Sequence, residues 1–176
     1  MKKLIIVAIA AVIMIIPSVA SAQTASGTLT VTATVNGSIS LVFNSDAAGV
    51  ALSSGAGTNT ATLAFGNVSA FGAIAAGIVR STTAVSFTVS SAVDVLVTKA
   101  NSASANYTLK AQLGAADATN TWTVGLVAVT NAGPATITAT GAYAANSNFP
   151  VAITVPFATA SGTVISNTIN YTATAN

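Results

Sequence analysis

The sequence predicts an all-β protein built as an antiparallel β-sandwich of about eight to ten strands. From Gln23 onward, apolar residues recur at every second position in short runs rich in Val, Ile and Thr. That alternation is typical of half-buried strands. Gly, Asn, Ser and Pro separate the runs, and only Phe71–Ile78 has room for one helical turn.

Each predicted strand is bounded by turn-forming residues. The expected strands are Thr28–Val35, Ser38–Phe43, Ala61–Val68, Thr82–Ser90, Ala92–Lys99, Asn106–Leu113, Thr121–Thr130, Ala135–Tyr143, Pro150–Phe157 and Thr163–Thr174. The clearest alternation lies in Asn106–Leu113, where Tyr107 and Leu109 begin the apolar face and Lys110 belongs to the polar one. We expect all the strands to form a single domain.

The first 22 residues have the pattern of a secretory signal peptide. Lys2 and Lys3 precede thirteen apolar residues, 4–16, and residues 20–22 are a small-residue cleavage site. The apolar run is shorter than the roughly 20 residues of a spanning helix. We therefore expect residues 1–22 to be cleaved and residues 23–176 to be secreted without a membrane span. The destination would be the cell surface or the medium, through the periplasm if the cell is Gram-negative.

The formal charge of +2 falls to zero once the leader is removed. The remaining charged residues are Arg80, Lys99, Lys110, Asp46, Asp94 and Asp117. Nucleic-acid recognition requires clustered basic residues, so we expect no nucleic-acid partner.

The sequence also excludes most catalytic chemistry. It has no His and no Cys, which removes the usual nucleophile–base pairs and the commonest zinc ligands. Asp46 and Asp117 lie in turn-like segments, and Asp94 lies on the polar side of a strand. We predict that the protein is not an enzyme and binds no cofactor and no metal. Trp122 is in phase with apolar neighbours, which favours a core position over a sugar-stacking platform.

The alternation of apolar and polar residues keeps the same phase across Asn36-Gly37, although this dipeptide usually marks a hairpin. The apolar residues on either side are Leu29, Val31, Ala33, Val35, Ile39, Leu41 and Phe43. A two-residue turn would place Val35 opposite Ser38, and opposed residues share a face. We therefore predict one extended segment, kinked or bulged at Gly37.

Few charges protect the sheet edges, because three Lys or Arg residues serve about ten strands. This favours strand addition between subunits. We predict residues 23–35 as a donor arm, with Asn36 and Gly37 as its hinge. The donor side chains would be Leu29, Val31, Ala33 and Val35. The alternative is that the arm pairs within its own molecule.

Two further segments carry a family resemblance. Leu63–Val68 has a leucine-x-phenylalanine-glycine strand pattern, and Ala160–Thr172 has a Ser/Thr-rich, alternating C-terminal pattern. With the leader and the Thr/Val-alternating first strand, the chain resembles bacterial fimbrial-subunit and spore-coat-U-like proteins. The resemblance implies an immunoglobulin-like sandwich that serves as a pilus or coat subunit, sometimes assembled by a chaperone and usher.

We therefore expect a secreted structural subunit that self-associates into surface filaments, a coat or an extracellular matrix. Its partners would be other copies or related subunits, with a secretion chaperone as a further candidate. The alternative function is a carbohydrate- or surface-binding adhesion module.

Overall fold

A computed structural model describes residues 26–176, so the leader and the cleavage site predicted over residues 1–22 lie outside the described residues. The chain divides into two units, one ending at Thr34 and one spanning Val35–Asn176. Every regular element among the described residues is a strand, which confirms the all-β prediction. The helical turn considered for Phe71–Ile78 is not formed.

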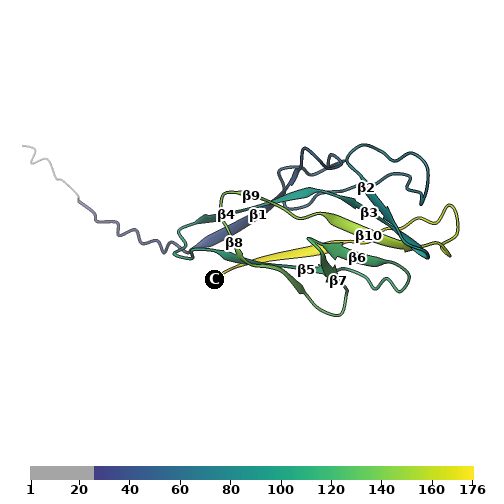
Figure 1. Cartoon of the computed structure of the whole chain (residues 1–176). Helices are drawn as coiled ribbons and strands as arrows, with labels where there is room; N and C mark the ends of the chain where they lie inside the picture. The colour runs from purple at the N-terminus through teal and green to yellow at the C-terminus, as the bar shows by residue number, and fades with distance from the viewer. Residues whose placement is uncertain (1–25) are drawn as a thin grey trace, which may run out of the picture. The chain divides into compact units, whose positions relative to one another are not determined.

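The second unit contains all the strands (Figure 1). They are β1 (Ser38–Ser45), β2 (Val79–Thr82), β3 (Ser86–Ser91), β4 (Val93–Ala100), β5 (Tyr107–Leu113), β6 (Thr121–Val124), β7 (Val127–Val129), β8 (Ala135–Gly141), β9 (Asn146–Asn148), β10 (Val151–Pro156) and β11 (Ile169–Ala175). All their pairings are antiparallel.

The larger layer consists of two sheets that continue into each other. One sheet has the order β1-β4-β9 and the other β2-β3-β10-β6-β7. Only Ala92 separates β3 from β4, and the pairing runs from Ser91 opposite Val151 to Asp94 opposite Asn148. The Phe149 amide bridges the break by donating to the Val93 carbonyl at 2.9 Å. These strands therefore form one long, bent layer.

The smaller layer has the order β11-β5-β8, and β11 is the yellow strand that ends at the C-terminus in Figure 1. Its central strand, β5, alternates as predicted. The buried side chains are Tyr107, Leu109, Ala111 and Leu113, whereas Lys110 is exposed. Tyr107 and Leu109 pack against Val95 and Val97 of β4, in a cluster with almost no solvent exposure. Burial of one face from each layer stabilises the fold.

Three predicted strands are wrong in whole or in part. No strand forms over Thr28–Val35, Ala61–Val68 contains only one isolated bridge, and Thr163–Thr174 is a strand only from Ile169. All three have the alternation of a strand. A strand also requires a hydrogen-bonded neighbour. Among the described residues, 28–35, 63–68 and 164–167 have no backbone–backbone hydrogen bond to one.

The predicted strand Thr121–Thr130 is also wrong, because it is a hairpin of β6 and β7. Gly125 and Leu126 form its turn with φ values of 54° and 72°. Both residues have the left-handed backbone that a tight hairpin turn requires. Leucine rarely adopts that conformation, so this turn could not be predicted from Gly125-Leu126. The short strands β2 and β9 were not predicted, and immunoglobulin-like connectivity stays a prediction.

Candidate functional site

A large open groove lies over the inner face of the longer layer. Its volume is about 1470 Å³, whereas small-molecule pockets occupy roughly 300–1,000 Å³. Two chain segments form its walls, residues 59–68 and residues 161–171, and part of β1 lines it as well. The size and the elongated walls suit a segment of polypeptide better than a metabolite.

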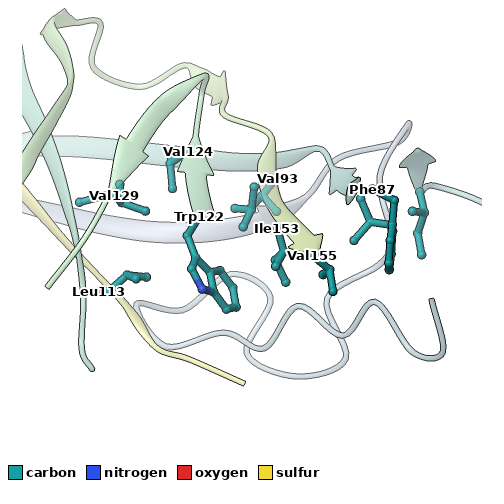
Figure 2. Packing of buried hydrophobic residues seen from close by; sticks show 12 residues of the cluster. Phe87, Val93, Leu113, Trp122, Val124, Val129, Ile153 and Val155 are labelled. Atoms are coloured by element: carbon teal, nitrogen blue, oxygen red, sulfur yellow. The ribbon is translucent and has the colours of Figure 1, made fainter. Parts of the chain in front are cut away.

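The floor of the groove is apolar, and its side chains are buried because residues of the walls pack over them. It consists of side chains from β3, β4, β6 and β10, namely Val89, Val93, Trp122, Val151, Ile153 and Val155. Figure 2 shows Trp122 beside Ile153 and Val155, with all three side chains on the same side of the sheet. Elsewhere the smaller layer covers this face. At the groove, extended segments without β-ladders take its place.

The two walls resemble strands that lack partners. Leu63 and Phe65 from one wall, and Ile165 from the other, pack against the buried core. Among the described residues, no backbone–backbone hydrogen bond involves residues 63–68 or 164–167. The walls therefore bury apolar side chains as strands do, while their main-chain groups depend on solvent.

Two aromatic side chains line the groove near β1. Phe43 and Tyr171 meet edge to face, with ring centroids 5.1 Å apart. Burial raises the pKa of the Tyr171 hydroxyl well above its usual value. Because this contact joins β1 to β11, it marks the point where the two layers close on each other.

A polar clamp holds Trp122 in the floor. The indole Nε1 donates to the Asp117 carboxylate at 2.8 Å, and the Asn120 amide donates to the same carboxylate at 2.8 Å. Desolvation would raise the pKa of Asp117, but hydrogen bonds from Asn120, Trp122 and Thr119 outweigh it and lower the pKa to about 2. The core position predicted for Trp122 and the turn role predicted for Asp117 are both confirmed, whereas the bond between them was not foreseen.

The predicted donor side chains are all exposed. Leu29, Val31 and Val35 are 87%, 79% and 72% exposed, and Ala33 is exposed as well. Large apolar side chains are costly to leave in water. Burial of these side chains against another surface would therefore be favourable.

The predicted hinge directly precedes β1, which begins at Ser38 and pairs with β4. No strand precedes β1 in the described residues, so Asn36-Gly37 does not form a hairpin. A Cβ on Gly37 would lie 2.8 Å from the Asn101 carbonyl oxygen. Position 37 therefore favours glycine because a side chain would not fit there. This reason is independent of the predicted hinge.

The second unit carries an exposed aromatic pair. Phe71 is 73% exposed and Phe157 39%, with ring centroids 5.9 Å apart. Arg80 fixes the loop that carries Phe71 by donating to the carbonyls of Ser69 and Gly72 at 2.9 and 2.8 Å. The sequence analysis did not bring this pair together. Phe71 lies in an irregular segment, and Phe157, predicted as the last residue of a strand, lies just beyond the end of β10 at Pro156.

The charged residues do not gather into a site in the described part of the chain. Asp46 accepts from the Ala48 amide in a turn, as predicted, and Asp94 accepts from Asn148 on the outer face of the sheet. Residues 26–176 contain no group of three His, Cys, Asp or Glu side chains that could hold a metal ion. They also contain no helix of the length and apolarity needed to cross a membrane.

Comparisons with protein-family models, with curated proteins and with solved structures find no match to this chain. The interpretation of the groove therefore depends on its own geometry and chemistry.

Proposed function

We propose that the protein is a secreted structural subunit whose copies join by strand addition, the exposed arm of one copy occupying the groove of the next. The open groove is the observation that carries this proposal. Its apolar floor is buried beneath walls in which residues 63–68 and 164–167 have no backbone hydrogen-bond partners among the described residues. Strand addition would supply these partners, since main-chain hydrogen bonds provide affinity and alternate side chains fill the pockets.

The arm has complementary properties. Its apolar side chains occur at alternate positions, so all of them would face the floor of the groove in an extended conformation. Thirteen residues at about 3.3 Å each would extend about 43 Å, and the eleven wall residues 161–171 about 36 Å. Each fully buried Leu or Val would stabilise the complex by about 1.5–3 kcal/mol before the cost of ordering the arm.

The low charge of the protein supports the same function. With three acidic and three basic side chains outside the leader, neighbouring copies meet little electrostatic repulsion. Secretion, a surface location and an immunoglobulin-like sandwich are parts of this proposal, supported by the leader pattern and by the resemblance to fimbrial and coat subunits. No catalytic step is required of it.

The test uses two matched variants of the full mature chain. Leu29→Asp/Val31→Asp places charges on the side chains that would enter the groove. Thr30→Asp/Thr32→Asp places the same charges on the opposite face of the arm. We expect negative-stain microscopy to show fibres or ladders for the wild type and the threonine variant. The leucine/valine variant should stay monomeric, with association at least about 100-fold weaker. Equal assembly of the two variants would contradict donation by the arm.

The exposed Phe71–Phe157 pair supports a second candidate, an adhesion module that binds carbohydrate or another surface. Exposed aromatic rings are suited to stacking on sugars, and contiguous exposed apolar side chains often mark interaction sites. Phe71→Ser should abolish retention on insoluble polysaccharides such as chitin or cellulose if this function is correct. Failure of the wild type to be retained would remove this candidate and leave the proposal of assembly intact.

A further inference from the structure

One exposed loop of the protein carries no polar side chain. Residues 70–78 consist only of Ala, Gly, Ile and Phe, and residues 71–76 are all exposed. Phe71 is 73% exposed and Ile74 39%. Exposed runs of this length are avoided in soluble proteins unless they have a function, and contiguous exposed apolar patches mark interaction sites. The loop is therefore a candidate contact surface.

Two other segments extend this surface. Val85, in the turn between β2 and β3, is 71% exposed, and Phe157 follows the end of β10. The Phe157 amide donates to the Val85 carbonyl at 2.9 Å, and the Phe157 ring lies 5.9 Å from the Phe71 ring. Phe157 also stacks on the buried ring of Phe87, with centroids 6.4 Å apart. We call residues 70–78, Val85 and Phe157 the apolar patch.

The loop of the apolar patch is fixed at both ends. Near its start, Arg80 donates to the carbonyls of Ser69 and Gly72. At its end, Gly77 has a φ of 78°, and a Cβ there would lie 2.4 Å from the main chain of Gly49. Glycine alone combines that backbone with so close an approach. A surface whose conformation is already fixed loses little entropy on binding.

Several main-chain carbonyls of the apolar patch have partners inside the protein. The Phe71 carbonyl accepts from the Ser69 hydroxyl at 2.6 Å, and the Ala75 carbonyl accepts from the Ile78 amide at 3.3 Å. The Gly72 carbonyl is held by Arg80. An unpartnered carbonyl is costly to move out of water, so these bonds make it easier for the patch to enter an apolar environment.

We infer that the apolar patch docks on the surface of a lipid bilayer, where Phe71 and Ile74 enter the boundary between the headgroups and the acyl chains. This inference deepens the second candidate function, because it names the surface that the protein binds, and it does not depend on strand addition. Hydrocarbon offers no hydrogen-bond partners, and the side chains of residues 70–78 require none.

Other partners fit the apolar patch less well. A sugar needs polar groups placed to bond its hydroxyls, and the side chains of residues 70–78 supply none. A stable complex with a second copy uses about 800 Å² and roughly 20–30 residues from each partner, with about one hydrogen bond per 100–200 Å². A loop of nine residues with two further side chains is smaller and less polar than such an interface.

Charge should contribute little to this docking. Arg80 is the only charged residue in 47–93, and residues 118–176 contain none. Attraction to anionic lipids requires clustered basic residues, whereas the binding of apolar side chains scales with the area that they bury. We therefore expect the protein to bind a neutral bilayer without dependence on salt.

Flotation with phosphatidylcholine vesicles tests the inference on the full mature chain. The wild type should float equally well at about 0.1 M and about 1 M salt, although the Debye length falls from about 10 Å to about 3 Å. Phe71→Ser should weaken partitioning at least about tenfold. Leu126→Ser, the matched control, removes an apolar side chain that is 92% exposed and lies outside the patch. It should change partitioning by less than about twofold.

The variant Phe71→Trp gives a readout that does not depend on loss of binding. Lipids with brominated acyl chains should quench its fluorescence more strongly than that of the wild type, whose single tryptophan, Trp122, is buried. Leu29→Asp/Val31→Asp is measured in parallel because the arm is also apolar and exposed, and it should float as the wild type does.

Flotation that requires an anionic lipid such as phosphatidylglycerol and disappears in high salt would overturn the inference. Equal losses in Phe71→Ser and Leu126→Ser, loss only in the arm variant, or absence of flotation would overturn it as well. Retention of the wild type on chitin or cellulose without flotation would replace the bilayer by carbohydrate as the partner. Strand addition stands or fails separately, by the fibres of the wild type and the arm variants.

Discussion

The two ends of the sandwich core are covered by different kinds of structure. At the closed end, Val95 and Val97 of the longer layer face Tyr107 and Leu109 of the smaller one, and water is excluded. At the open end, the side chains around Trp122 and Ile153 are also buried, but the segments that cover them have no ladders and border an open groove. The same alternating sequence pattern thus yields a finished sheet only where a neighbouring strand is present.

The proposal of strand addition depends on this contrast. A finished sheet with paired edges offers little to a partner, whereas unpaired main chain beside an apolar surface is a template for strand addition.

Truncation of one leucine at each end should show the largest difference. Leu109 is fully buried at the closed end, and Leu63 is partly buried in the groove wall. Leu109→Ala should lower the free energy of unfolding by about 3–5 kcal/mol because a cavity remains. Leu63→Ala should cost about 1 kcal/mol, since the wall can relax into the groove. Urea unfolding of both monomers gives the comparison, and equal losses would mean that the two ends are equally well packed.

Overpacking the closed end should have the next largest effect. A Cβ at Gly141 would lie 2.2 Å from the Tyr107 ring, whereas nothing lies within 4 Å of a Cβ at Gly133. Gly141→Ala should destabilise the fold by about 3 kcal/mol, and Gly133→Ala should be close to neutral. Thermal unfolding distinguishes them. Similar melting temperatures would show that Tyr107 can move aside and that the closed end is loosely packed.

Removal of the clamp beneath the groove should have a moderate effect. Asp117→Ala leaves the buried indole N–H of Trp122 without a partner, which should cost about 1–3 kcal/mol in the free energy of unfolding. Trp122 fluorescence during urea unfolding measures the loss. A change below about 0.5 kcal/mol would show that the clamp does not hold the floor.

The Asp117 carboxylate should also make the free energy of unfolding depend on pH, with a smaller effect than its removal. Its pKa is lowered from 3.8 to about 2, so its contribution is complete above pH 4 and disappears as the pH falls towards 2. The wild type should therefore lose more stability than Asp117→Asn between pH 5 and pH 2. Urea midpoints across that range provide the measurement, and parallel curves would assign the acid sensitivity to another group.

The sequence was sufficient for the fold class and for the buried face of β5, because a period of two in the side chains depends only on local pattern. It also placed Trp122 in the core. It failed at Ala61–Val68 and at the first part of Thr163–Thr174, where the alternation is present and the ladder partner is not. Pairing is a property of two segments, so one segment's pattern cannot reveal that its neighbour is missing.

The groove was beyond sequence reasoning for the same reason. The sequence predicts a donor arm from the phase of Leu29, Val31, Ala33 and Val35, and the structure leaves these side chains exposed. The acceptor that we propose depends on how residues 59–68 and 161–171 approach a common floor. Nothing in either segment's own residues specifies that arrangement.

Disulfide trapping between separately labelled copies tests most directly whether the groove of one molecule receives the arm of another. The chain has no cysteine of its own, so one copy can carry Thr28→Cys, Thr30→Cys or Thr32→Cys, and a second copy Val164→Cys. After mixing and mild oxidation, we expect at least one arm position to form a cross-linked heterodimer. Thr172→Cys, on the outer face of β11, should form none. Equal cross-linking of the arm to the Val164→Cys and Thr172→Cys variants would contradict the account. So would the absence of any cross-link under conditions in which fibres still form.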